Sequence, residues 1–321
     1  MKFSVQLPSD RVEQLEDFVT AEAIATNAAA AEAAGFDACY VTEHPFPADS
    51  WLEHGGHHAL DPFVSLGVAA AATTRLRLHT NILVLAYRNP FLAAKAIASL
   101  DVVSEGRAIV GVAAGYLAGE FAALGAPFEE RNDRSDEALV AMKAAWTGES
   151  VRMGGAGFEA RGNRMLPRPI QRPHPPIWVG GNSPRAIRRA VEHGQGWSPF
   201  PLPAAGAGRA RSAAIESVED LARGIERMRA LAAERGRLEP LDVCFVPFGV
   251  AMNRRRPLEV EALREQLHAL ETIGVGWVSI GMPTQSRNAY LEGLAEFSEL
   301  FLQARSATSV GPAVKTPRGE G

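Results

Sequence analysis

Side chains that could do acid–base chemistry stand just after short β-rich runs of the sequence. Glu43 and His44 follow the run Ala38–Thr42, and Tyr116 comes shortly after the run Ala108–Val112. A carboxylate and an imidazole at the end of a strand are a candidate pair for general acid–base catalysis or for contact with a cofactor. The alternative is a pair of loop residues at the surface, and Tyr116 could reach a ligand or merely pack.

A second candidate site lies where another β-rich run passes into a helix. Gly180 and Gly181 end the run, Asn182 or Ser183 caps the helix, and Pro184 is its first residue. Backbone N–H groups at the start of a helix attract anions, so this turn is suited to a phosphate group. The alternative is a well-capped turn that binds no ligand.

The remaining polar signals are weaker. Asn81 is an isolated polar residue in the apolar run Leu76–Leu85, where it is either a hydrogen-bonded core amide or a ligand contact. His54, His57 and His58 share one glycine-rich loop, whereas zinc sites in barrels draw ligands from several strand ends. We therefore expect no metal site, and a loop near the pocket mouth with one histidine touching the ligand. The chain has no G-x-G-x-x-G, G-K-[ST] or G-x-S-x-G motif.

These residues need strands and helices to position them, and the two kinds of pattern alternate along the chain. The predicted strands are Phe3–Leu7, Ala38–Thr42, Leu76–Leu85, Ala108–Val112, Ile177–Gly180, Gly196–Ser198, Val243–Met252 and Trp277–Gly281. Helical patterns lie near 18–34, 62–73, 90–103, 132–147, 184–193, 217–234, 257–271 and 287–304. Left-handed glycines are expected to follow the helices at Gly35, Gly106, Gly194, Gly236 and Gly274. Eight alternating units favour an α/β fold, the (β/α)8 TIM barrel, whose active site lies at the C-terminal ends of the strands.

Two segments are too long to be plain connections. The segment 117–176 contains a helical pattern at Ser135–Trp146 and ends in a proline-rich stretch, which we interpret as a rigid connector. The segment 200–214 is rich in Pro, Ala and Gly and predicts a mobile loop that could act as a lid. Residues 1–304 are expected to form a single barrel domain with these insertions, and 305–321 a disordered tail.

Composition excludes several classes of function. The 321 residues carry a net charge of −4 without a basic block, which argues against nucleic acid as a partner. No apolar run is long enough to span a membrane, and the start of the chain lacks the apolar segment of a signal peptide. Cys39 and Cys244 both lie in apolar runs, as buried cysteines of a cytoplasmic protein do. A small-molecule substrate is the partner that remains.

Six stretches carry a resemblance to a known family. They are Val41–His44 (VTEH), Ala59–Val64 (ALDPFV), Leu76–Leu85 (LRLHTNILVL), Tyr87–Pro90 (YRNP), Gly106–Val112 (GRAIVGV) and Pro173–Pro184 (PHPPIWVGGNSP). Each is modestly specific, but in this order they resemble the luciferase-like monooxygenase superfamily, specifically its branch of F420-dependent oxidoreductases. The resemblance runs from residue 1 to about residue 303.

The resemblance implies a barrel with insertion segments and a cofactor across the strand C-termini, either the deazaflavin coenzyme F420 or FMN. It implies that a cis peptide bond between Asn81 and Ile82 backs the cofactor ring. By the same resemblance, His44 and Glu43 match the histidine and neighbouring acid after the second strand. Gly180, Gly181 and Asn182 match the phosphate-binding turn, and Ser183 stands at its helix start. The resemblance also implies a homodimer.

One residue departs from the family's pattern. In the branch that oxidises sugar phosphates, a glutamate stands where Tyr116 stands in this chain. The resemblance therefore does not extend to sugar-phosphate oxidation, and the substrate stays open.

Three functions follow from these expectations. In the first, an F420-dependent oxidoreductase, hydride passes between the deazaflavin and a substrate under the 200–214 loop, His44 exchanges the proton and Tyr116 orients the substrate. In the second, the chain is a luciferase-like monooxygenase that uses reduced FMN and O₂. In the third, the barrel binds flavin or F420 without catalysis. The phosphate turn serves both cofactors, so the sequence does not separate the first two.

Overall fold

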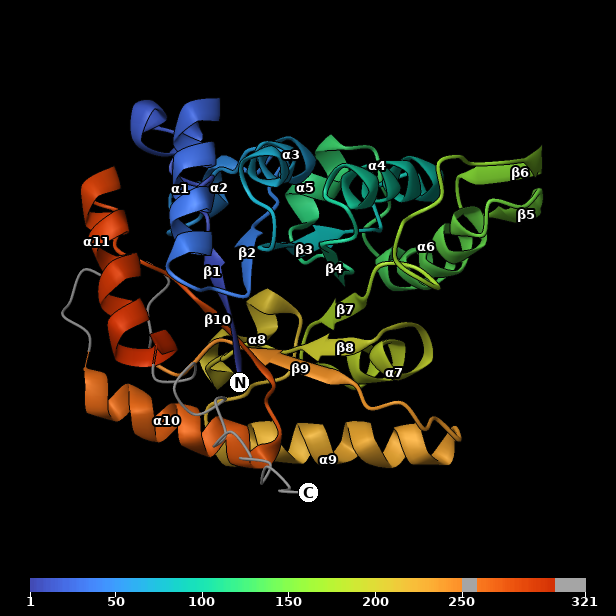
Figure 1. Cartoon of the computed structure of the whole chain (residues 1–321). Helices are drawn as coiled ribbons and strands as arrows, with labels where there is room; N and C mark the ends of the chain where they lie inside the picture. The colour runs from blue at the N-terminus through green and yellow to red at the C-terminus, as the bar shows by residue number, and fades with distance from the viewer. Residues whose placement is uncertain (250–258, 304–321) are drawn as a thin grey trace, which may run out of the picture.

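Eight parallel strands close into a barrel in the computed structural model, which describes residues 1–249 and 259–303 (Figure 1). The order around the barrel is β1-β10-β9-β8-β7-β4-β3-β2. The strands are β1 Lys2–Gln6, β2 Ala38–Val41, β3 Arg77–Val84, β4 Ala108–Ala113, β7 Ile177–Gly180, β8 Gly196–Ser198, β9 Asp242–Phe245 and β10 Trp277–Ile280. The (β/α)8 barrel predicted from the alternation is confirmed.

Helices surround the barrel and follow the strands in sequence (Figure 1). They are α1 Ala21–Ala33, α2 Asp49–Leu52, α3 Pro62–Ala72, α4 Pro90–Val103, α5 Ala118–Ala123, α6 Arg131–Trp146, α7 Pro184–His193, α8 Ala204–Ala210, α9 Val218–Glu234, α10 Val260–Ile273 and α11 Arg287–Phe297. Two π-helical turns, η1 Leu15–Val19 and η2 Ser298–Leu302, precede α1 and follow α11.

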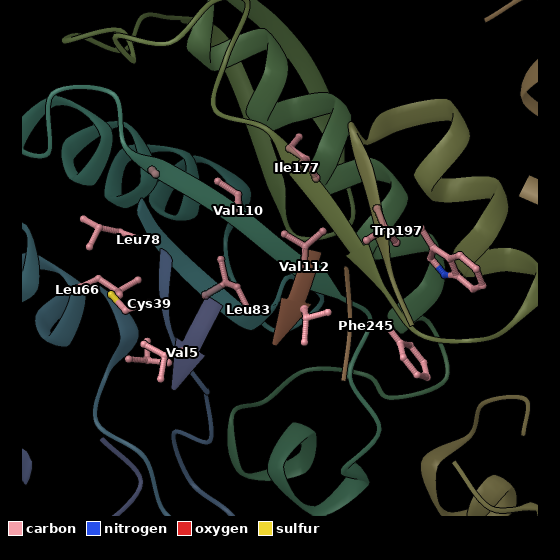
Figure 2. Packing of buried hydrophobic residues seen from close by; sticks show 14 of the residues in the cluster. Val5, Cys39, Leu66, Leu78, Leu83, Val110, Val112, Ile177, Trp197 and Phe245 are labelled. Carbon is pink, nitrogen blue, oxygen red and sulfur yellow. The ribbon is translucent and has the colours of Figure 1, made fainter. Parts of the chain in front are cut away.

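Each strand buries both of its faces, as strands of a barrel do. Outward-facing residues such as Val5, Cys39 and Leu78 pack against the surrounding helices, where Cys39 lies beside Leu66 of α3 (Figure 2). The residues that alternate with these form a smaller cluster of Ala38, Ile109, Trp178, Cys244 and Trp277. Because side chains alternate along a strand, this second cluster fills the inside of the barrel.

The helices that begin near the site have well-defined N-caps. The Asn89 side chain accepts hydrogen bonds from the N–H groups of Phe91 and Leu92, and Pro90 is the first residue of α4. Ser183 caps α7 in the same manner by accepting from Ala186 N–H, and Pro184 follows it. A cap with proline at the first helical position fixes where the helix starts, and therefore where the preceding turn lies.

The insertions contain more regular structure than the sequence predicted. The segment 117–176 holds α5, α6 and an antiparallel hairpin, β5 Val151–Gly155 and β6 Phe158–Asn163, which projects beyond α6 (Figure 1). The segment 200–214, predicted as a loop, contains the short helix α8. Alanine is the strongest helix former, and the alanines of this segment are sufficient for two turns.

Two further predictions were wrong in detail. The strand predicted as Val243–Met252 ends at Phe245, before Pro247, which cannot donate to a strand ladder; residues 250–252 lie outside the described residues. Gly194 is not left-handed, unlike the glycines at 35, 106, 236 and 274. It is instead needed for close approach, since a Cβ there would lie 3.0 Å from the Ile177 carbonyl oxygen.

The predicted tail, 305–321, lies outside the described residues. Within the described part of the chain, no helix is both long and apolar enough to cross a membrane.

Candidate functional site

A cavity of about 570 Å³ opens at the C-terminal ends of the barrel strands. It brings together most of the residues predicted from the sequence: Glu43, His44, Asn81, Ile82, Tyr116, Gly180, Gly181 and Ser183. Asn182 is the exception, because its side chain is built into the wall behind the cavity. The size is typical of small-molecule sites, which span roughly 300–1,000 Å³.

His44 faces a carboxylate that the sequence analysis did not single out. The Nδ1 atom of His44 lies 3.7 Å from Oε2 of Glu120, on helix α5. Glu120 is 3% exposed, and its other oxygen accepts a hydrogen bond from the Phe46 N–H at 3.2 Å. A separation of 3.7 Å is longer than a hydrogen bond, so the carboxylate lies beside the edge of the imidazole without bonding to it directly.

Two aromatic rings hold the His44 imidazole in place. The Trp51 ring lies 4.4 Å from it and the His57 ring 4.8 Å, centre to centre. The Nδ1 atom of His57 is hydrogen-bonded to the His58 carbonyl oxygen at 2.9 Å, and burial lowers the pKa of His57. The histidine-rich loop therefore contributes packing around His44, and His54 is bonded elsewhere, to the Ser50 carbonyl.

Glu43 lines the cavity, but both of its carboxylate oxygens are engaged by the protein. Oε2 accepts a hydrogen bond of 2.7 Å from the Val84 N–H, and Oε1 forms an ion pair with Arg88. Burial raises the pKa of the Glu43 carboxyl, whereas the Arg88 guanidinium acts in the opposite direction. These contacts tie the end of β2 to the end of β3, which fixes His44 next to the cavity floor.

The floor of the cavity is an irregularity in β3. The register between β3 and β4 shifts between Thr80 and Leu83, and the Asn81–Ile82 peptide bond in this bulge is cis, as the sequence analysis expected. A Cβ on Gly180 would lie 2.1 Å from Cδ1 of Ile82. Gly180 therefore leaves room for the end of the Ile82 side chain, which would have to shift if a Cβ stood there, a reason for glycine that is independent of any phosphate.

The turn after β7 is braced by the segment that follows β8. The Asn182 side chain donates to the carbonyl oxygens of Phe200 and Ala213 and accepts from the Phe200 N–H, at 2.8–3.0 Å. The Asn182 N–H donates to the Ser212 hydroxyl at 2.8 Å. Asn182 thus positions the 200–213 segment over the cavity, while Ser183 and the start of α7 face into it.

Tyr116 lies at the cavity rim. Its ring centre is 6.5 Å from that of His44, and burial raises the pKa of its phenol, to which the charge of Glu120 adds. A neutral phenol at this place can donate a hydrogen bond to a ligand near His44.

Sequence reasoning missed the functional neighbours that come from helices. No strand end marks these residues: Trp51, Glu120 and Arg131 stand on short or inserted helices, and Arg211 directly follows α8.

Across residues 1–249 and 259–303, no group of three or more His, Cys, Asp or Glu side chains gathers in a way that could hold a metal ion.

Comparisons with known proteins agree with the fold. The sequence model of the family described as luciferase-like monooxygenase matches residues 1–309. An uncharacterised protein of Mycobacterium tuberculosis is 31% identical over 281 residues, covering 83% of this chain and 90% of the relative. An F420-dependent glucose-6-phosphate dehydrogenase of Beutenbergia cavernae is 37% identical over 171 residues, 52% of this chain and 49% of the relative. An FMNH2-dependent dimethylsulfone monooxygenase of Pseudomonas putida is 38% identical over 130 residues, 40% and 35% of the two chains.

Solved structures show the same barrel. The monooxygenase RslO1 from Streptomyces bottropensis superimposes with a TM-score of 0.74 at 22% identity, over 95% of this chain and 100% of its own. The coenzyme F420-dependent tetrahydromethanopterin reductase from Methanopyrus kandleri gives a TM-score of 0.70 at 17% identity, over 94% and 99% of the two chains. With the family match over nearly the whole sequence, the chain belongs to the luciferase-like monooxygenase family and is an oxidoreductase of that family.

Proposed function

We propose that the protein is an F420-dependent oxidoreductase that acts on a small organic substrate. The observation that carries the proposal is the meeting, in one cavity, of an apolar floor and a histidine–carboxylate pair. The F420-dependent relative from Beutenbergia cavernae supports the choice of cofactor. When bound, a deazaflavin supplies hydride-transfer chemistry, and the protein's task is to position and protonate.

The residues of the cavity fit such a cofactor. Ile82, Val84 and Ala113 give the floor an apolar surface against which a flat ring can pack. The start of α7 at Ser183 offers backbone N–H groups for a phosphate group at the other end of the cavity. Gly180 and Gly181 keep side chains out of the space between these two places.

We assign separate roles to residues of the protein: proton exchange, orientation of the substrate and positioning. His44 holds or releases the proton that balances the hydride, because its ring lines the cavity beside the Glu120 carboxylate and is held there by Trp51 and His57. Tyr116 orients the substrate from the rim. Glu43 acts as a positioning residue through its contacts with Arg88 and Val84 N–H. That the protein is a cytoplasmic homodimer with a single barrel domain over residues 1–304 stays a prediction.

The substitution His44→Ala tests the proposed role of His44 in proton exchange. General acid–base catalysis contributes about 10²–10⁴-fold, so kcat in F420-dependent turnover should fall by that factor while the Kd for F420 is unchanged. His268→Ala, which removes an exposed histidine of α10, is the matched control. Unchanged turnover in His44→Ala would remove His44 from the reaction.

A second candidate function, FMN-dependent monooxygenation, is favoured by the FMNH2-dependent relative from Pseudomonas putida. The same floor and the same helix start suit FMN. Oxygen consumption by the protein with reduced FMN and an aldehyde or a sulfone, above the rate without substrate, would favour this function over the first.

A further inference from the structure

Four arginines line one wall of the cavity, near the start of α7, and they differ in how their charges are balanced. Arg189 and Arg185 both form ion pairs with Asp136 of α6, and Arg185 also pairs with Asp133. These two guanidinium groups are therefore neutralised within the protein.

The other two arginines of this wall, Arg131 and Arg211, are less well balanced by carboxylates. Arg131 is only 11% exposed, yet its nearest carboxylate, Glu129, is 4.0 Å away and 85% exposed, an arrangement that contributes little. Arg211 forms no ion pair within 4.0 Å among the residues that the structure describes. Burial lowers the pKa of Arg131; the charge of Glu129 acts in the opposite direction, and the positive charge of Arg211 lowers the pKa further.

A single aromatic ring holds both guanidinium groups in place. The guanidinium carbon of Arg131 lies 4.0 Å from the centre of the Phe128 ring, and that of Arg211 lies 5.2 Å from it. The Arg131 side chain also donates a 2.9 Å hydrogen bond to the Phe128 carbonyl oxygen. Because stacking on an aromatic ring leaves the N–H edges of a guanidinium open, both arginines keep donors for a further acceptor.

Arg131 and Arg211 lie near the turn after β7. Arg211 directly precedes Ser212, whose hydroxyl accepts from the Asn182 N–H. Arg131 is the first residue of α6, the helix whose Asp133 and Asp136 pair with α7. Arg131 and Arg211 therefore stand beside the helix start to which the proposed function assigns a phosphate, and they add a second place for negative charge.

We propose that Arg131 and Arg211 bind an anionic group of the cofactor tail that lies beyond the phosphate, a carboxylate in chemical class. The inference rests on the proposed function. Two like charges held side by side are stabilised when an anion binds between them, and guanidinium groups match carboxylates in geometry. A tail with a phosphodiester and further carboxylates, such as the glutamyl tail of F420, can occupy both the start of α7 and the Arg131/Arg211 pair. FMN carries one phosphate and can occupy only one of them.

The test compares two deazaflavins that differ only in the tail. Fluorescence titrations would measure the Kd of F420 and of the same deazaflavin whose tail ends at the phospholactyl group, without glutamates. The unmodified protein should bind F420 about tenfold more tightly than the shortened form. In the double variant Arg131→Gln/Arg211→Gln, the affinity for F420 should fall to that for the shortened form, which itself should change little.

Arg188→Gln provides the matched control, since Arg188 is a partly exposed arginine of α7 paired with Glu192. The variant Arg131→Lys/Arg211→Lys keeps both charges and should retain part of the preference. Thermal melting checks that each variant is folded. A salt titration of the unmodified protein gives a second measurement, since the preference for F420 should shrink from 50 mM to 500 mM salt.

Three outcomes would overturn the inference, and they are distinguishable. Equal affinity of the unmodified protein for the two deazaflavins would mean that an anion at this place belongs to the substrate. A preference that survives Arg131→Gln/Arg211→Gln would place the recognition of the carboxylates elsewhere. Failure to bind either deazaflavin would overturn the proposed function itself, and the inference with it.

Discussion

The imidazole of His44 and the carboxylate of Glu120 lie 3.7 Å apart, although one residue follows β2 and the other lies on α5 after β4. The Phe46 N–H donates to the other oxygen of Glu120, so the loop that carries His44 is bound to the same carboxylate. Glu120 thus both orients this loop and supplies the charge that faces the imidazole.

Glu120→Gln removes this charge while keeping the shape of the side chain. We expect kcat to fall about tenfold to a hundredfold, because the proton-exchanging imidazole of His44 loses the carboxylate that faces it, while the Kd for F420 changes less than twofold. Glu296→Gln, on the exposed side of α11, is the control. If the Kd rose and kcat stayed the same, Glu120 would serve only to shape the cavity.

Gly180 and Ile82 should show a strong coupling in a double-mutant cycle. In Gly180→Ala the new Cβ would meet Cδ1 of Ile82 at 2.1 Å, so the Ile82 side chain must move. We expect the free energy of unfolding to fall by about 1–3 kcal/mol and the affinity for the cofactor to weaken. Ile82→Val removes the Cδ1 atom, so adding it to Gly180→Ala should recover part of both losses. Strictly additive effects in urea unfolding would contradict this packing.

Arg107 should matter for stability and not for the site. Its guanidinium donates to the carbonyl oxygens of Ala70, Thr73, Leu76 and Ser104 and to the Thr73 hydroxyl, at 2.7–3.0 Å. It precedes β4, at the end of the barrel opposite the cavity. Because several carbonyl groups lose a charged donor, Arg107→Gln should lower the free energy of unfolding by about 2–4 kcal/mol.

Arg75→Gln, an exposed arginine at the same end of the barrel, is the control for Arg107 and should change stability by less than about 0.5 kcal/mol. The Kd for F420 should be unchanged in both variants. A weakened Kd in folded Arg107→Gln would show that the two ends of the barrel are coupled.

His79 should make the protein less stable in acid. It is fully buried inside the barrel against Trp178, and burial lowers its pKa to about 3. The unfolded chain binds a proton near pH 6.5, so stability decreases as the pH falls from about 6.5 towards 3, by at most about 1.4 kcal/mol per pH unit.

His79→Leu removes this titration. The difference in unfolding free energy between the unmodified protein and the variant should therefore shift in favour of the variant as the pH falls below 6.5. Urea unfolding at pH 7, 6 and 5 measures this difference. A difference that is the same at all three values would contradict a buried neutral His79.

The strand ends were predictable from the sequence because parallel strands bury both faces. The runs around Val5, Cys39 and Val110 are apolar and bounded by turn residues, so the number and order of the strands could be predicted. The residues just after the strands, His44, Tyr116 and the turn at Gly180, could then be identified. The role of Gly180 could not, because its close contact with Ile82 joins two strands that are distant in sequence.

The insertions were less predictable because their structure depends on partners. The hairpin β5–β6 is largely exposed and contains Gly154 and Gly155, so it shows no alternation of apolar and polar residues. Glu120 lies beside His44, and Arg131 lines the cavity, only because the inserted helices fold back over the strand ends. No local sequence pattern indicates that these helices fold back over the strand ends.

The central claim is that the cavity at the strand ends binds a deazaflavin. Its most direct test is the titration of the purified protein with F420 and, separately, with FMN, followed by fluorescence. We predict binding of F420 with a Kd in the micromolar range or below, and weaker binding of FMN. Micromolar binding of FMN with no binding of F420 would contradict the account.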